Sequence, residues 1–516
     1  MLCLRGCLAG LVMFVASAVV SVVTAADRDA LLKQPSAGIN FTSPVDYASE
    51  LPLVDVFRTS RKWISQTEGA AWGKGPELEL DDHGYVTKLQ PGSWVETPVC
   101  NIDGGHYPSG VYTLIYDGDG EIEIGGAGKV TKRNSAGNYS VMVDASRGPI
   151  WVRVRRIDSA NHIRNIRLIM PGFQDTYQDN PWRPGFMKLW SSMNAFRSMD
   201  WQHTNNSTIE NAADFPSMDD ANWSERGLPI EMICDFANRT RQTPWVCVPH
   251  LATDEAVRHM ATVINDSLDK DACVIVEYSN EVWNGQFMQC QYVQQRGVEL
   301  KLGDKPWEAG WAYTGKRSIE VFKIFEDVFG GTQRLIRTLP SQSANAYVAG
   351  KIVEAALKDG SADALAIAPY MGMNVQPEKV DEILSLGLQG IFKNANDEIL
   401  PETVRHIQDN QQVAQKNGLA LVAYEAGQHF VGIGPAMNND GLTKLLHDVN
   451  ADPRMGDLYR QYLDAWSENG GALMCLFSST GSWSKYGSWG LTQYADDDPS
   501  ASPKLKAVSD WAESTK

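Results

Sequence analysis

The stretch Val274-Ile275-Val276-Glu277-Tyr278-Ser279-Asn280-Glu281-Val282-Trp283-Asn284 begins as an apolar, β-branched run and ends in an amide, a carboxylate and an aromatic ring. This pattern predicts a buried strand that carries Asn280 and Glu281 at its carboxyl end. A later run of the same design, Leu419-Ala420-Leu421-Val422-Ala423-Tyr424-Glu425-Ala426-Gly427, also ends in a glutamate. Two buried strands that each end in a carboxylate supply the pair of groups that cleavage of a glycosidic bond requires.

Further apolar runs alternate with helix-period segments on both sides of these two strands. They lie near 196–201, 245–250, 334–338, 364–370 and 472–477. These five runs, the two glutamate-bearing strands and a further run near 51–57 make eight strand–helix repeats. Eight such repeats predict a (β/α)8 TIM barrel of buried parallel strands. The alternative is an open, doubly wound sheet, but no glycine-rich nucleotide fingerprint follows any of the strands.

The segment 76–171 has a different texture, with period-two alternation and turns rich in Gly, Asp and Asn. It predicts about eight short strands in an all-β, sandwich-like domain inserted after the first barrel strand. We therefore expect the segment 26–75 to hold that first strand and 172–516 to hold the rest of the barrel. We expect the inserted domain to brace the barrel, and glycan binding is the alternative.

Residues 1–25 predict a cleaved signal peptide. Arg5 is the only charge, 8–23 is apolar, and Val23-Thr24-Ala25 forms a small-residue cleavage site. An uncleaved anchor is the alternative, although the apolar run is short for a membrane-spanning helix. We expect the mature chain to be exported to the periplasm or the extracellular space, with no membrane contact after cleavage.

The composition excludes several classes of partner and cofactor. A formal net charge of −17 without a basic stripe argues against a nucleic-acid partner. Cys247, Cys273 and Cys475 fall in or beside apolar runs and are expected to be buried thiols. No cysteine spacing resembles a zinc site, so we expect neither a metal nor another cofactor.

Glu281 ends the fourth predicted barrel strand and Glu425 ends the seventh, so the two should face each other across the barrel mouth. With Asn280 before Glu281 and Gly427 after Glu425, the chain resembles the retaining glycoside hydrolases of clan A over roughly 185–510 plus the first strand. The resemblance implies that Glu281 is the acid/base and Glu425 the nucleophile. It also implies that Tyr370 touches the nucleophile and that Trp483 or Trp489 floors the sugar site.

The chemistry of a retaining mechanism assigns different protonation states to the two glutamates. Glu281 must hold a proton, which burial and the charge of Glu425 should favour, whereas Glu425 must stay ionised. Candidate donors to Glu425 are the residues at the ends of predicted strands one, two and six: Arg58, Arg197 and Tyr370. Asn280 is the candidate that holds the sugar 2-hydroxyl.

Other polar and aromatic residues at predicted strand ends or rim loops are candidate sugar contacts. These are His250, Trp201, Trp283, Trp483 and Trp489. The alternative for His250 is a satisfied core histidine, and any single tryptophan can equally serve packing. Glu277 lies on the same strand face as Glu281 and is expected to be a structural ion-pair partner.

We therefore expect an exported retaining glycoside hydrolase that cleaves β-linkages in a poly- or oligosaccharide. The alternative is a non-catalytic carbohydrate-binding protein on a hydrolase-like barrel. A metal-dependent barrel hydrolase is a third option, but the nine histidines are too scattered to supply a ligand set.

Overall fold

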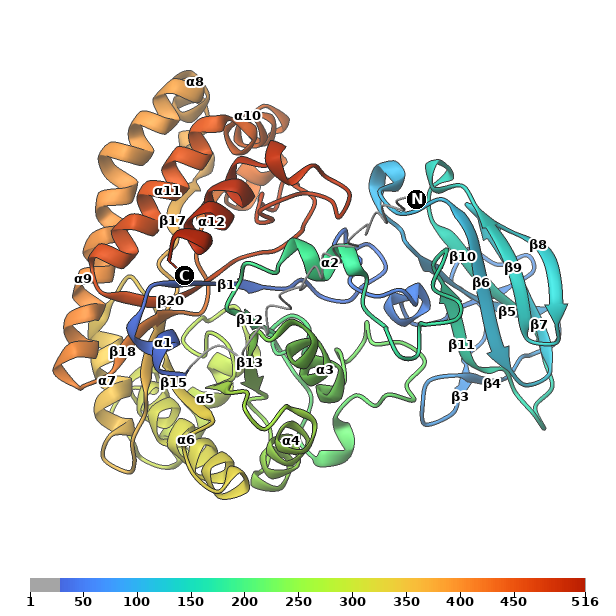
Figure 1. The fold of residues 1–516 in the computed structure, drawn as a ribbon, viewed down its shortest axis with the longest axis horizontal. Coiled ribbons are helices and arrows are strands. Elements are labelled where there is room, and N and C mark those ends of the chain that lie inside the picture. The colour runs from blue at the N-terminus through green and yellow to red at the C-terminus, as the bar shows by residue number, and fades with distance from the viewer. Residues whose placement is uncertain (1–27, 516) are drawn as a thin grey trace, which may run out of the picture.

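The computed structural model describes residues 28–515, so the predicted signal peptide lies outside the described residues. The chain forms a helix-covered barrel, on the left of Figure 1, and a smaller all-β unit on the right. Within residues 28–515, none of the helices has the length and apolar character needed to cross a membrane.

Eight parallel strands close the barrel, which confirms the predicted (β/α)8 architecture. In spatial order they are β1 (Ser36–Asn40), β12 (Ala195–Arg197), β13 (Thr243–Val248), β14 (Val274–Tyr278), β15 (Leu335–Pro340), β16 (Ala364–Ile367), β18 (Ala420–Ala423) and β20 (Gly471–Leu476). The barrel closes where β1 pairs with both β12 and β20. Nearly every strand residue is buried, which is why these strands read as continuous apolar runs.

The first barrel strand is Ser36–Asn40, so the prediction of a strand near 51–57 is wrong. Ser36-Ala37-Gly38-Ile39-Asn40 is too short and too rich in small residues to give an apolar signal. A Cβ at Gly38 would lie 2.5 Å from the Cys475 Sγ on β20, so the packing requires glycine there. Leu51, Val56 and Phe57 instead join the core of the all-β unit, Leu53 packs in the barrel core, and Val56–Thr59 is a 3-10 turn.

Helices surround the barrel, as Figure 1 shows. They are α1 (Arg28–Lys33), α2 (Pro184–Leu189), α3 (Ile230–Thr240), α4 (Asp254–Ser267), α5 (Met288–Glu299), α6 (Pro306–Phe329), α7 (Ala346–Ala356), α8 (Val380–Asn394), α9 (Leu400–Lys416), α10 (Asp440–Ala451), α11 (Pro453–Glu468) and α12 (Pro503–Ser514). The long helix α6 ends at Gly330, whose φ of 72° places it in the left-handed conformation that glycine favours at a helix end.

The inserted unit is a sandwich of two four-stranded antiparallel sheets. One sheet has the order β2 (Ile64–Thr67), β5 (Ser93–Val99), β10 (Ile150–Ile157) and β7 (Gly120–Gly126). The other has the order β11 (Arg164–Ile169), β6 (Gly110–Asp117), β9 (Asn138–Val143) and β8 (Gly128–Ser135), and a hairpin of β3 (Glu79–Leu80) and β4 (Val86–Lys88) lies beside them. The unit follows β1 and precedes β12, as the sequence predicts.

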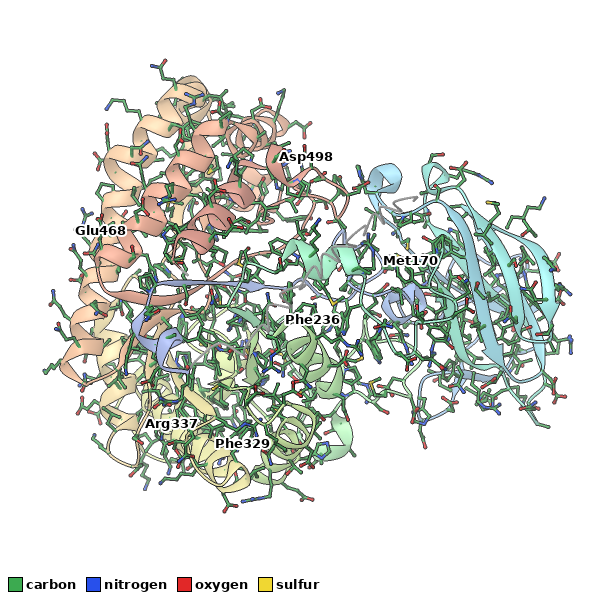
Figure 2. All side chains as sticks on the ribbon, viewed as in Figure 1. Met170, Phe236, Phe329, Arg337, Glu468 and Asp498 are labelled. Carbon is green, nitrogen blue, oxygen red and sulfur yellow. The ribbon has the colours of Figure 1, made fainter. Side chains whose placement is uncertain are left out.

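Two features outside the barrel and the sandwich shape the surface around the strand ends. After β16 and β18 the chain continues into β17 (Met371–Val375) and β19 (Gln428–Gly432), which pair in parallel beyond the barrel rim. Figure 2 shows Met170 on the sandwich side of the junction between the two units and Phe236 of α3 on the barrel side.

Candidate active site

Glu281 and Glu425 both follow barrel strands at their carboxyl ends, Glu281 after β14 and Glu425 after β18. Glu425 is 6% exposed, whereas Glu281 is half-buried. The two carboxylates lie close enough for the charge of Glu281 to affect the ionisation of Glu425. The barrel therefore brings both predicted catalytic carboxylates to one place.

Glu425 is held by two of the three predicted donors. Arg197 Nη1 donates to Oε1 at 2.9 Å, and the Tyr370 hydroxyl donates to Oε2 at 3.0 Å. Burial raises the pKa of Glu425 to about 8; the positive charge of Arg197 opposes this shift, the negative charge of Glu281 adds to it, and the Tyr370 hydrogen bond opposes it. Glu425 thus keeps a high proton affinity despite two donors.

Arg197 is a fully buried hub beneath the site. Its Nε and Nη2 atoms donate to the two oxygens of Glu277 at 2.9 and 3.1 Å, and Nη2 also donates to Asn280 Oδ1 at 2.8 Å. Glu277 is completely buried and also accepts from Trp245 Nε1, so the prediction of a structural ion pair is confirmed. One guanidinium therefore donates to two buried carboxylates, Glu277 and Glu425.

Glu281 stands on strained backbone and has two donors of its own. Ser279 and Glu281 have φ values of 58° and 38°, and a non-glycine residue in this region costs on the order of 1–3 kcal/mol. Asn284 Nδ2 donates to Oε2 at 2.9 Å, and the Tyr424 hydroxyl lies 3.3 Å from Oε1. Such strain is typical of functional sites, where the surrounding contacts hold a side chain in a fixed position.

A cavity of about 360 Å³ opens beside Glu281 and beside Tyr370, the residue that donates to Glu425. Its wall includes Glu281, Tyr370 and Tyr424, together with residues of β17 and α9. Glu402 and His406, one helical turn apart on α9, also line it. No Lys or Arg occurs among the described residues that line it.

Two of the predicted aromatic contacts lie at this cavity. Trp283 lines it directly. The ring of Trp489 lies 6.3 Å from Tyr370 and 4.6 Å from His429, two residues that do line the cavity. Trp483 instead lines a separate cavity with Lys504, so of the two candidates for the sugar floor the geometry favours Trp489.

Two predicted site residues, Arg58 and Trp201, lie elsewhere. Arg58 donates to the backbone oxygens of Met218 and Asp220, because the chain at 51–58 belongs to the sandwich side and not to a barrel strand. Trp201 is fully buried and stacks on Phe41 with ring centroids 4.6 Å apart. The expectations that Arg58 orients Glu425 and that Trp201 lies on the rim do not fit these positions.

His250 and Asn280 are buried near the site. His250 is 2% exposed, packs against Tyr292, and has its pKa lowered to about 4 by burial. It is therefore a core histidine, but its buried Nδ1 has no hydrogen-bond partner among the described residues, so it is not the satisfied histidine of the alternative. Asn280 is 2% exposed, accepts from Arg197 and donates to Asn205 Oδ1 at 2.9 Å.

Sequence reasoning missed several residues of the site. Asn40, at the end of β1, donates to the Tyr424 backbone oxygen at 2.8 Å and accepts from Arg197, and it was overlooked because β1 was misplaced. Tyr424 directly precedes the predicted nucleophile, so its position at a strand end was a usable signal. Glu402 and His406 had no such signal, because they reach the cavity from a helix.

Comparisons with known proteins add the following. No protein-family model and no curated protein matches this chain. Among solved structures, a 4-O-alpha-L-rhamnosyl-beta-D-glucuronidase from Fusarium oxysporum is 10% identical over 66% of each chain, with a TM-score of 0.37. A broad-specificity GH5-4 endoglucanase from Clostridium longisporum is 9% identical over 67% of this chain and 90% of its own, with a TM-score of 0.36.

The GH53 catalytic domain of Ignisphaera aggregans is 10% identical over 64% of this chain and 89% of its own, also with a TM-score of 0.36. At these identities and TM-scores the comparisons carry no argument about this chain. The closed eight-stranded parallel barrel of the chain itself is the fold that the resemblance to clan A implied. Among residues 28–515, no group of three or more His, Cys, Asp and Glu side chains is arranged to hold a metal ion.

Proposed function

We propose that the protein is a retaining glycoside hydrolase that cleaves β-linkages in poly- or oligosaccharides, with Glu281 as acid/base and Glu425 as nucleophile. The observation that carries the proposal is the pair of carboxylates at the ends of β14 and β18, each held by two donors, beside a cavity. Two such carboxylates with different surroundings are what double displacement requires.

In the first step, Glu425 attacks the anomeric carbon while Glu281 gives its proton to the departing glycosidic oxygen. In the second, Glu281 takes a proton from water, whose oxygen displaces Glu425 from the sugar. Arg197 and Tyr370 fix the two oxygens of Glu425 throughout. Glu281 returns to its protonated form at the end, so the protons balance over the cycle.

The first step needs one proton on the pair, located on Glu281. Before substrate binds, the high pKa of Glu425, about 8, keeps one proton on the pair of Glu281 and Glu425 at neutral pH. The electropositive anomeric carbon of a bound sugar stabilises the Glu425 anion, and Arg197 and Tyr370 add to this stabilisation. The proton is thereby held on Glu281 once the sugar is bound, and Glu281 gives it to the departing oxygen in the transition state.

The charge of the cavity restricts the sugars that it suits. Glu402 on its wall has neither an ion pair nor a hydrogen bond among the described residues, and no cation lines the cavity. A uronic acid would therefore meet repulsion without a compensating partner, so the substrate class we propose is a neutral or amine-bearing β-glycan.

The direct test is Glu425→Gln, which keeps the shape of the side chain and removes the nucleophile. We expect kcat on a panel of soluble β-glucans, xylans, mannans and chitosan to fall by at least ~10³-fold, with the circular dichroism unchanged. Proton NMR of the first product formed by the wild-type chain should show the β-anomer. The matched control is Glu468→Gln at the exposed end of α11. Figure 2 labels Glu468 at the left edge of the barrel, opposite the sandwich.

Two results would decide against the proposal. Full activity in Glu425→Gln would remove its role as nucleophile. Binding of a glycan without turnover by the wild-type chain would favour the alternative, a carbohydrate-binding protein on a hydrolase-like barrel.

A further inference from the structure

A cavity larger than the one beside Glu281 lies away from Glu281 and Glu425, between the sandwich and the barrel. Its volume is about 760 Å³, within the range of ~300–1,000 Å³ that is usual for ligand sites. Strands β6 and β11 of the sandwich form one wall, and helix α3 of the barrel forms another, which places it in the junction to the right of α3 in Figure 1.

The floor of this junction cavity presents hydrogen-bond donors. Arg58 is 6% exposed, its guanidinium lies 4.5 Å over the Trp223 ring, and its terminal nitrogens donate to backbone oxygens. Arg167 lies beside it, and both approach the same carboxylate, Asp55. Arg167 Nη1 donates to a backbone oxygen, whereas its Nη2 has no partner among the described residues. This nitrogen is free to donate to a ligand.

The rim of the junction cavity presents hydrogen-bond acceptors. Glu231, in the first turn of α3, is exposed and has no ion pair or hydrogen bond among residues 28–515. Asp117 at the end of β6 receives Asn165 Nδ2 on one oxygen at 2.8 Å, which leaves its other oxygen available. Apolar side chains, among them Ile115 and Met232, also line the cavity.

This mixture of groups selects the chemical class of the ligand. An anion would meet Asp117 and Glu231, and a cation would meet Arg58 and Arg167, so neither is favoured. A neutral polyhydroxylated molecule suits both, because each hydroxyl can accept from a guanidinium and donate to a carboxylate. Its C–H faces would lie on the apolar side chains.

We infer that the junction cavity is a second, non-catalytic saccharide-binding site built jointly by the sandwich and the barrel. That it holds the same glycan that the barrel cleaves rests on the proposed function, whereas saccharide binding at the junction does not. Two linked sites on one chain raise the effective concentration of a long substrate at the catalytic cavity. The inserted sandwich then contributes half of a binding site in addition to bracing.

The test is isothermal titration of the inactive Glu425→Gln chain with cellohexaose, xylohexaose and mannohexaose, which are all neutral. We expect at least one of them to bind at two sites per chain. Glu231→Ala, which removes an exposed, unpaired carboxylate, should weaken one of the two events by at least ~10-fold. Ile115→Trp, which fills the junction cavity from β6, should abolish that event. The matched control is Glu255→Ala, an exposed glutamate in the first turn of the neighbouring helix α4.

Activity separates this inference from the proposed function. In the otherwise wild-type chain, Glu231→Ala and Ile115→Trp should lower hydrolysis of the polymer several-fold and leave hydrolysis of an aryl glycoside unchanged. Hydrolysis by the wild-type chain without any Glu231-dependent binding would overturn the second site and leave the proposed function standing. A Glu231-dependent binding event in a chain that hydrolyses nothing would support the second site and overturn the proposed function.

Discussion

Tyr424 and Glu425 are neighbours in the chain, yet their side chains serve different carboxylates. The Tyr424 hydroxyl lies 3.3 Å from Glu281 Oε1, and its ring lies beneath the guanidinium of Arg197, 4.9 Å away. Arg197 in turn donates to Glu425. A single buried cluster therefore positions both catalytic candidates, and a change at one of its members should be felt at both.

Replacing Tyr424 with Phe tests this coupling at one atom. The hydroxyl stabilises the Glu281 anion that forms once the proton has been given up, so its loss should lower kcat by about 10–100-fold, the value of one hydrogen bond to a charged group. KM should change little, because the ring stays in place. Steady-state kinetics measures both, with Tyr486→Phe at an exposed position as the control. An unaltered kcat would show that Tyr424 only fills space.

At the scale of elements, the loop after β20 is fastened from two sides. Lys504 Nζ of α12 and Gln428 Nε2 of β19 both donate to the backbone oxygen of Ser488, at 2.6 and 2.8 Å. Ser488 precedes Trp489, the favoured sugar floor. Lys504 is completely buried, and burial lowers the pKa of its amine. A buried donor that holds a loop oxygen thus fixes the height of the tryptophan ring.

Lys504→Met should loosen this loop. The substitution keeps the length of the side chain but removes one of the two donors to Ser488, a loss of about 1 kcal/mol. We expect KM for an oligosaccharide to rise about 5-fold with a smaller change in kcat, since Trp489 lies outside the reacting atoms. Lys506→Met, an exposed position on the same helix, is the matched control. Equal KM values in the two variants would contradict the role of Lys504.

The composition of the strands also explains which parts of the fold could be predicted from the sequence. Strands β14 and β18 are buried on both faces, so they appear as unbroken apolar runs, and the glutamates that follow them are correctly placed. Strand β1 is made of small residues, because Gly38 must fit against Cys475, and it leaves no such run. Because the sequence predicts the first barrel strand near 51–57, Arg58 is expected at its end, and Asn40 at the end of the true strand is not predicted as a site residue.

The remaining residues of the site depend on tertiary structure. Trp201 follows a strand as a rim residue would, but the chain folds it into an aromatic cluster with Phe41. Glu402 belongs to a helix whose distance from the strand ends is set by the β17–β19 extension. Neither periodicity nor strand order contains this information, because loops and extensions determine where such side chains lie.

At the scale of the whole molecule, Glu50 lies where the barrel meets the segment that leads to the sandwich. It is 1% exposed, and the Ser479 hydroxyl, from the loop after β20, donates to one of its oxygens. The neighbouring Ser49 accepts a backbone hydrogen bond from Ala495, and Asp46 pairs with Arg61 at 2.6 Å. The contacts of the segment 46–50 therefore link the loop after the last barrel strand to the start of the inserted unit.

Burial raises the pKa of Glu50 to about 8, which makes the stability of the fold depend on pH. A folded-state pKa above the unfolded value gives a contribution that is fully present below about 4.5 and is lost as the pH rises through about 8. In Glu50→Gln this loss disappears. The variant should therefore gain stability relative to the wild-type chain between pH 5 and pH 8, on the order of 3 kcal/mol.

Urea unfolding midpoints of the two chains at pH 5 and pH 8 measure this difference. The control is Glu68→Gln, an exposed glutamate in the sandwich unit, which should follow the wild-type chain at both values. Because the comparison is a difference between chains, other groups that titrate in this range cancel. A difference in unfolding midpoint between Glu50→Gln and wild type that does not widen from pH 5 to pH 8 would show that Glu50 is already ionised in the folded protein at pH 5. In that case the contacts around Glu50 hold a buried charge without a compensating partner.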